Sequence, residues 1–270
     1  MFEKVIPALV TPFDATENID YGSLEKLLTH LHNVPQILIA GTTGEGSSLT
    51  LAEIEDMIIY IRSRFPEFDL IVNTGRGSLQ ETLACTRRSV ALGVEKALVM
   101  LPPYILPPFE GIKKYFTQVT EEIPHVIVYH HPRRTGKTLS AEELVELAAI
   151  DGISGIKDCS GDLRLMRHVA SRTLLFCGND ELYVPALRAG AGGIITPLGN
   201  ADYSLFVQIA DALEAGDVEL LESLQKELGR KIDATHQWVN PIGIKILLSD
   251  MGLIEPNMRL PLCLPQVRCS

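Results

Sequence analysis

The sequence predicts a (β/α)8 barrel of the α/β class. Eight apolar runs of strand length are spread along the chain, helical patterns lie between them, and no large insertion interrupts the series. The runs alternate little in polarity, which is typical of strands covered on both faces in a parallel sheet. Eight such strand–helix units indicate a closed barrel surrounded by helices.

The eight predicted strands follow one another along the first two hundred residues. We expect them at Val5–Val10, Ile37–Ala40, Leu70–Val72, Ala97–Met100, Val126–Tyr129, Ile153–Ile156, Leu174–Phe176 and Gly193–Ile195.

Helical periodicity fills the intervals between the strands. Apolar residues recur at the spacing of one helix face, namely Leu24, Leu27, Leu28 and Leu31, then Ile54, Met57, Ile58, Ile61 and Phe65. Capping-box spacings, Thr50 with Glu53 and Ser140 with Glu143, predict two helix starts. Further helices are expected at 218–232 and 242–251. We therefore divide the chain into a catalytic barrel, 1–216, and appended C-terminal helices, 217–270, with no linker of a second independent domain.

Composition excludes several classes of function. The chain has 270 residues, 46% of them hydrophobic, and a net charge of −10 without a basic block, which argues against nucleic acid or an anionic membrane as a partner. No apolar run reaches the length of a membrane span, and the start lacks the pattern of a signal peptide. Five cysteines without CxxC spacing fit reduced thiols in a cytoplasm.

The barrel prediction places the active site at the carboxyl ends of the strands. The segments found there are rich in Gly, Thr, Tyr and Pro, with one Lys. Glycine lets the backbone approach a small ligand, and threonine offers hydroxyl and amide donors to a carboxylate. These segments are Thr11-Pro12, Gly41-Thr42-Thr43-Gly44, Asn73-Thr74-Gly75, Pro102-Pro103-Tyr104, Tyr129, Lys157, Gly178-Asn179-Asp180 and Thr196-Pro197.

Lys157 is the most informative of these residues. It closes an apolar strand, where a lysine needs either a partner or a chemical role. Tyr129 ends another apolar run and is soon followed by Arg134, so amine, phenol, guanidinium and two threonine hydroxyls gather at strand ends. This set indicates a site that handles a carbonyl compound. The alternative is three unrelated surface loops.

The sequence gives no indication of a metal or nucleotide site. His130 and His131 are adjacent, so on a continuing strand they would face opposite sides, and we expect each histidine to be a surface or hydrogen-bonded residue. The HExxH, GxGxxG and GxxxxGK[ST] motifs are all missing from the sequence.

These residues resemble the dihydrodipicolinate synthase / N-acetylneuraminate lyase family of Schiff-base aldolases. The resemblance runs from Leu9-Val10-Thr11-Pro12-Phe13 to Leu260-Pro261. Its marks are Gly41-Thr42-Thr43-Gly44-Glu45, the Tyr129-x-x-Pro132-x-Arg134-Thr135-Gly136 segment and Gly155-Ile156-Lys157-Asp158, which are specific only in combination. The arginine of the second motif and Asn240-Pro241-Ile242-x-x-Lys245 are typical of the synthase branch.

The resemblance implies a reaction and a role for each site residue. Lys157 would form an imine with pyruvate, and its enamine would add to aspartate semialdehyde, without a metal or organic cofactor. The family's proton relay matches Tyr129, Thr42 and Tyr104, the last supplied by a neighbouring subunit of a homodimer or homotetramer. Thr43 would hold the carboxylate of pyruvate and Arg134 that of the second substrate. The backbones of Gly178 and Ile195 would line the pyruvate pocket.

Some assignments have plain structural alternatives. Arg134 could pair with Glu142 or Glu143 at the surface, and Tyr104 could only pack at a dimer surface. Thr42 and Thr43 could simply shape a turn. Asp158 is expected to be a helix-cap or solvated residue and not a catalytic acid.

The chain also departs from the family pattern. His130-His131 replaces Asn-Val, Pro103 stands where the first of two tyrosines is usual, and the end lacks the family's last helix, which leaves dimer or tetramer open. The pocket for inhibitory lysine has Gly77 and Pro103 in place of asparagine and tyrosine, and Leu51 and Ile54 where some members have histidines. Of that pocket only Glu81 remains, so we expect weak or absent feedback by lysine.

Three functions remain open from the sequence. The first is condensation of pyruvate with aspartate semialdehyde. The second is a pyruvate-dependent aldolase for a sugar acid such as 2-keto-3-deoxygluconate. The third is a non-catalytic pyruvate-binding paralogue. The joint presence of the six predicted site side chains argues against it: Lys157, Tyr129, Thr42, Thr43, Tyr104 and Arg134.

Overall fold

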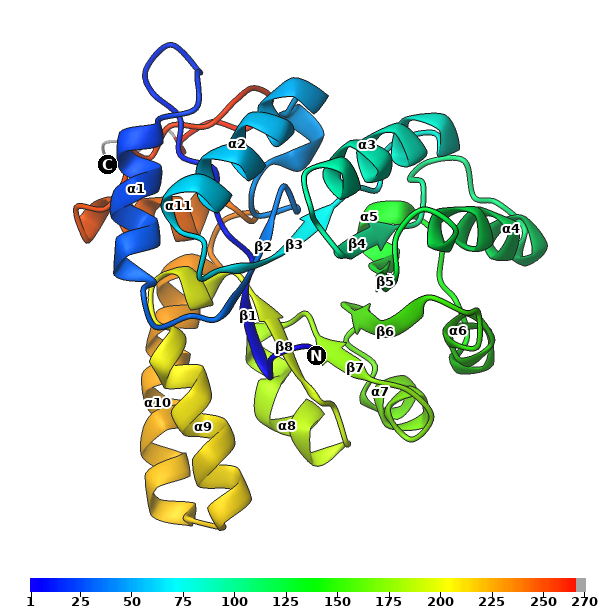
Figure 1. The fold of residues 1–270 in the computed structure, drawn as a ribbon. Coiled ribbons are helices and arrows are strands. Elements are labelled where there is room, and N and C mark those ends of the chain that lie inside the picture. Colours follow the sequence, from blue (N-terminus) through cyan, green and yellow to red (C-terminus); the bar gives the residue numbers. More distant parts are fainter. Residues whose placement is uncertain (266–270) are drawn as a thin grey trace.

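The computed structural model describes residues 1–265 and contains an eight-stranded parallel barrel surrounded by helices (Figure 1). From β2 to β8 each strand pairs with its sequence neighbour, and β1 pairs with β8. A bridge between Ala8 and Leu38 links the first two strands, with a hydrogen bond of 2.8 Å from the Leu9 amide to the Leu38 carbonyl. The predicted (β/α)8 fold is confirmed.

The strands lie close to their predicted positions, with shifts of one to three residues at their ends. They are β1 (Val5–Pro7), β2 (Gln36–Ile39), β3 (Asp69–Asn73), β4 (Lys96–Met100), β5 (His125–His130), β6 (Ile153–Asp158), β7 (Leu175–Cys177) and β8 (Gly193–Thr196). The first strand is shorter than predicted because the Val10 amide bonds the Asn200 side chain at 3.1 Å and not a neighbouring strand.

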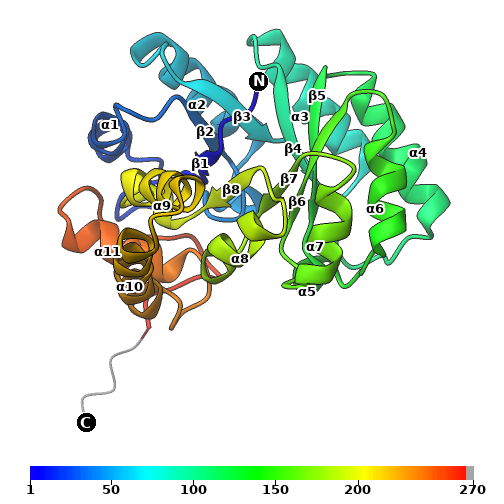
Figure 2. The same cartoon turned by 90° about the horizontal axis from the view of Figure 1, so that it is seen from below.

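Helices follow the strands around the barrel (Figure 2). The α-helices are α1 (Tyr21–His30), α2 (Leu51–Arg64), α3 (Leu79–Ala91), α4 (Phe109–Thr120), α5 (Pro132–Thr135), α6 (Ala141–Ala148), α7 (Leu163–Ala170), α8 (Tyr183–Arg188), α9 (Tyr203–Ala215), α10 (Val218–Thr235) and α11 (Ile242–Asp250). Short 3-10 helices are η1 (Gly46–Ser48), η2 (Asp180–Leu182) and η3 (Leu198–Asn200). Within residues 1–265 no helix combines the length and the apolar character needed to cross a membrane.

The predicted apolar faces and caps account for the packing of the helices. Leu24, Leu27 and Leu28 of α1 are fully buried against the barrel. Both predicted capping boxes are confirmed: the side chains of Thr50 and Glu53 cap α2, and the equivalent serine and glutamate cap α6. A second, smaller apolar cluster fills the inside of the barrel beneath its carboxyl end. Strand ends on this filled interior provide a rigid floor for a site.

The C-terminal helices are tied to the barrel by buried charges. Helices α9 and α10 run side by side, and α11 lies on the side of the barrel that carries β2 (Figures 1 and 2). Lys245 of α11 is fully buried and forms an ion pair with Glu45, which follows β2 in the 41–45 loop. The Lys245 ammonium also donates to the Asn257 carbonyl at 2.7 Å, and the Arg259 amide donates to Glu45 at 3.0 Å. The loop after β2 is thereby held by the end of the chain.

Replacing Glu45 with glutamine should destabilise the protein strongly. The change leaves the Lys245 ammonium buried without its counter-charge, and breaking one side of a buried pair costs about 3–5 kcal/mol. Urea denaturation followed by circular dichroism measures the loss. Glu122→Gln, which breaks the surface pair with Arg87, is the matched control and should change little. An unchanged urea midpoint for Glu45→Gln would contradict a structural role for the pair.

Candidate active site

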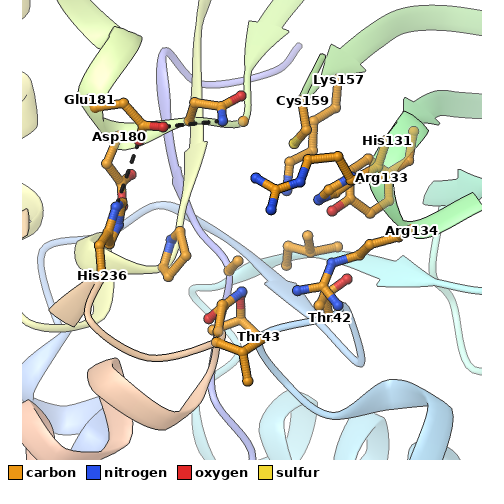
Figure 3. Close-up of a pocket in the computed structure, with 18 of the residues that line it drawn as sticks. Thr42, Thr43, His131, Arg133, Arg134, Lys157, Cys159, Asp180, Glu181 and His236 are labelled. Atoms are coloured by element: carbon orange, nitrogen blue, oxygen red, sulfur yellow. Dashed lines mark hydrogen bonds and ion pairs between the residues drawn. The ribbon is translucent and has the colours of Figure 1, made fainter. Parts of the chain in front are cut away.

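A cavity of about 570 Å³ opens at the carboxyl end of the barrel, and Lys157 contributes to its wall (Figure 3). Tyr129 also lines this cavity. The two residues come from neighbouring strands, where Tyr129 of β5 is directly paired with Lys157 of β6. Side chains at paired positions of a sheet point to the same face. The Lys157 Nζ therefore lies over the Tyr129 ring, 4.6 Å from its centre.

Burial changes the acid–base chemistry of both side chains. Lys157 is 6% exposed and Tyr129 is 5% exposed. Loss of hydration lowers the pKa of the Lys157 amine below 10.5, and the charge of Arg134 lowers it further, while Cys159 and Asp180 act in the opposite direction. Burial also raises the pKa of the Tyr129 phenol well above 10, against a smaller lowering by its hydrogen bond with Thr42. The arrangement favours a neutral amine beside a protonated phenol.

Thr42 and Thr43 lie in the loop that follows β2, and both line the cavity. Glycines hold this loop against the barrel: a Cβ on Gly46 would lie 1.7 Å from the Ala40 carbonyl oxygen. The Thr43 hydroxyl accepts a hydrogen bond of 3.1 Å from the Asn240 side-chain amide. Its own proton is therefore free to point elsewhere, so Thr43 can donate to an anion in the cavity.

Gly178 and Ile195 occupy different positions relative to the cavity. Gly178 lines it, and a Cβ there would lie 2.1 Å from the Cys159 Sγ and 2.9 Å from the Lys157 Cε, so only glycine leaves room for the lysine side chain. The Ile195 side chain is fully buried in the cluster inside the barrel, and the role of its backbone in lining the pyruvate pocket stays a prediction. The hydrocarbon of Ile195 supports the floor from below.

Arg134 faces the cavity, as does its neighbour Arg133 (Figure 3). The surface alternative for Arg134 does not hold: within residues 1–265 it forms no ion pair with Glu142 or Glu143, and Glu143 instead caps α6 through Ser140. Both arginines lie on α5, a single helical turn directly after β5. The guanidinium groups are thus placed by the same strand that carries Tyr129.

Tyr104 is not brought into the cavity of its own chain. Its side chain is 92% exposed, and Ile105 and Leu106 beside it are 61% and 57% exposed. The backbone of Tyr104 has a φ of 77°, in the left-handed region that non-glycine residues rarely adopt. An exposed apolar segment of this kind is typical of a surface that another protein chain covers.

The adjacent histidines face opposite sides of the strand, as predicted. His130 is fully buried, and its Nδ1 lies 2.6 Å from Asp158. Asp158 is therefore neither solvated nor the cap of α7, which is Asp162; it also accepts from the amide and hydroxyl of Ser160. The expectation for His131 was wrong, because this residue lines the cavity with an Nδ1 that has no hydrogen-bond partner in the described chain.

The opposite wall contains residues that the sequence did not single out as functional. The Asp180 carboxylate is buried, with one oxygen 3.4 Å from the His236 Nε2 and the other without a partner within residues 1–265. Asp180 follows β7 and belongs to the strand-end segment Gly178-Asn179-Asp180 that was predicted to lie at the active site, without a role of its own. His236 and Trp238 come from the segment between α10 and α11, for which no pattern was available. No group of three or more metal-ligating His, Cys, Asp or Glu side chains occurs in the described part of the chain.

A second cavity, of about 630 Å³, adjoins the first, and Arg134 and Asn240 line both. Its wall includes Gly77, Glu81 and Pro103, three of the positions assigned to the lysine pocket. Leu51 and Ile54 do not contribute to it. Weak or absent inhibition by lysine stays a prediction.

The stability of the protein should fall at acid pH through His131. Burial, with the charges of Arg134 and Lys157, lowers the pKa of this imidazole from 6.5 to about 4. Between these values the unfolded chain binds the proton more tightly, so the contribution of His131 to stability is complete above pH 6.5 and is lost as the pH falls toward 4, by about 1–2 kcal/mol because solvent screens the partly exposed ring. Urea titrations from pH 7.5 to 4 should show a flatter curve for His131→Asn. The exposed His32→Asn is the control, and equal curves for both variants would contradict the assignment.

Comparisons with known proteins agree with this geometry. The model of the dihydrodipicolinate synthetase family matches residues 1–266. The 4-hydroxy-tetrahydrodipicolinate synthases of Exiguobacterium sibiricum and Archaeoglobus fulgidus are each 33% identical, over 97% of this chain and 92% of theirs. The crystal structure of dihydrodipicolinate synthase from Bacillus anthracis has a TM-score of 0.94 at 28% identity, covering 99% of this chain and 95% of that one. The chain therefore belongs to the dihydrodipicolinate synthetase family.

Proposed function

We propose that this protein condenses pyruvate with L-aspartate 4-semialdehyde to give 4-hydroxy-tetrahydrodipicolinate, a step toward diaminopimelate and lysine. The observation that carries the proposal is the buried Lys157 amine beside the Tyr129 phenol, with Arg134 in the same cavity. The chain belongs to a family in which similar proteins are named 4-hydroxy-tetrahydrodipicolinate synthase, and this supports the same reaction.

The first half of the reaction forms an imine on Lys157. The neutral amine attacks the ketone carbon of pyruvate, and its lowered pKa increases the fraction able to do so. The Tyr129 phenol, kept protonated by burial, donates a proton to the departing hydroxyl, so that water leaves. Thr43 holds the carboxylate of pyruvate through the hydroxyl proton that its bond with Asn240 leaves free.

The second half forms the new carbon–carbon bond. Loss of a methyl proton from the imine gives an enamine, which adds to the aldehyde carbon of the semialdehyde. The amine of the semialdehyde then attacks the imine carbon, closes the ring and releases Lys157. Arg134 offers a planar fork to the carboxylate of this substrate. The proposed chemistry uses side chains of the protein and calls for no metal or organic cofactor.

A second copy of the chain completes the proton relay in this proposal. Tyr104 is exposed at the end of β4 beside Ile105 and Leu106, and we infer that this segment packs against another copy and brings the phenol to Thr42 there. The relation is reciprocal in a homodimer, and two such dimers could form a homotetramer. A cytoplasmic location is also part of the proposal. It is based on the odd number of cysteines and on their lack of CxxC spacing, which fit reduced thiols.

Treatment with pyruvate and borohydride should leave one reduced adduct per chain, on Lys157. Burial makes this amine more often neutral at pH 7 to 8 than an ordinary lysine. Mass spectrometry of the intact chain and of its peptides measures the adduct. Lys157→Ala should remain unmodified. Lys245 serves as the internal comparison in the peptide map, because it is also buried but is engaged by Glu45; an adduct on Lys245, or none at all, would contradict the Schiff-base mechanism.

Arg134→Ala should lower kcat/KM for aspartate semialdehyde by about tenfold to a few hundredfold, because charge-assisted hydrogen bonds contribute roughly 1.5–3 kcal/mol each. Borohydride trapping with pyruvate should be almost unchanged, and Arg134→Lys should recover only part of the loss. The coupled assay is run with pyruvate plus aspartate semialdehyde and, in parallel, with pyruvate plus glyceraldehyde.

The same assay on the unaltered enzyme separates the three functions considered above. Preference for glyceraldehyde would support the sugar-acid aldolase and remove the proposed reaction. Trapping of pyruvate without turnover of either aldehyde would support the non-catalytic paralogue.

A further inference from the structure

Helix α5 presents two consecutive arginines to the cavity. Arg133 and Arg134 are both exposed, both line the cavity that contains Lys157, and Figure 3 shows both guanidinium groups directed into the space in front of the lysine. Consecutive residues on a helix point about 100° apart, so both side chains must bend toward the same space. The family motif accounts for Arg134 alone.

Neither guanidinium is neutralised by the protein. Within residues 1–265, Arg133 and Arg134 take part in no ion pair and their side chains donate no hydrogen bond to a protein group. The acidic residues of the opposite wall have other partners: Asp180 bonds His236, and Glu181 accepts from Asn179 at 3.4 Å. Two adjacent like charges repel each other, and an anion bound between them offsets this repulsion.

The two arginines differ in the cavities that they line. Arg134 also lines the second cavity, whereas Arg133 faces only the one with Lys157. The charge of Arg134 acts on Lys157, Tyr129, Cys159 and His131, and that of Arg133 also acts on His131. Arg133 is therefore directed only into the cavity that contains the reacting amine, where it can meet the second substrate.

We propose that Arg133 is a further specificity-determining residue, which binds the carboxylate of the second substrate together with Arg134. The inference rests on the proposed function. In aspartate semialdehyde the carboxylate is separated from the aldehyde carbon by two carbon atoms, so an aldehyde held at the enamine extends its carboxylate toward the cavity mouth. A second guanidinium selects anionic aldehydes over neutral ones, because a neutral aldehyde leaves both cations without a partner.

The test compares two aldehydes in the intact enzyme. For Arg133→Ala we expect kcat/KM for aspartate semialdehyde to fall about tenfold to a hundredfold, mainly through a higher KM. The same variant should keep the parental kcat/KM for glyceraldehyde and the parental rate of borohydride trapping with pyruvate. Arg133→Lys should recover part of the loss, since it restores the charge without the fork.

Arg172→Ala is the matched control. This exposed arginine precedes β7 at the opposite end of the barrel, so the variant removes the same charge far from the cavity and should behave as the parent. Equal activity of Arg133→Ala and the parent toward both aldehydes would overturn the inference and leave the proposed function standing. An equal loss for both aldehydes, or impaired trapping, would assign Arg133 to the pyruvate site or the fold and also overturn it. A parent enzyme that prefers glyceraldehyde would remove the proposed function and this inference together.

Discussion

The burial of one amine is the constraint on which the rest of the site depends. An ordinary lysine has only about one neutral molecule in a few thousand at pH 7, and each unit by which the pKa falls gives about ten times more. The barrel interior around Lys157 lowers that pKa, and Gly178 is needed to leave room for the side chain. The carboxylate of Asp180 raises the pKa of Lys157. The pKa of the amine is therefore set by its loss of hydration and the charge of Arg134 on one side and by the charge of Asp180 on the other.

A buried pair behind the site fixes the strands that carry Lys157 and Tyr129. His130 and Asp158 occupy the next paired positions of β5 and β6 and face the outer layer. The Leu139 amide donates to the His130 Nε2 at 3.1 Å, so the proton of the neutral ring lies on Nδ1 and is donated to Asp158. Asp158 is thereby occupied by structural hydrogen bonds. This is why a carboxyl group next to the lysine in sequence is unsuited to act as an acid in the cavity.

The sequence predicted the barrel and the residues of its strand ends because both follow from short-range patterns. Apolar runs located β5 and β6, and their ends located Tyr129 and Lys157. The misplaced residues depend on contacts that no local pattern encodes. Asp158 was expected to be a helix-cap or solvated residue because its partner His130 lies 28 positions earlier in the sequence. His236 reaches the cavity only through the path of the chain between α10 and α11.

The segment that leads into α11 makes the C-terminal part a component of the site. It contributes His236 to one wall, and it supplies Asn240, which orients the Thr43 hydroxyl and lines both cavities. The buried pair between Lys245 and Glu45 holds this part of the chain to the loop that carries Thr42 and Thr43. Loosening the pair would therefore disturb the pyruvate side of the cavity, while the arginines on α5 would keep their positions. Carboxylate recognition at the two ends of the site thus depends on separate elements of the fold.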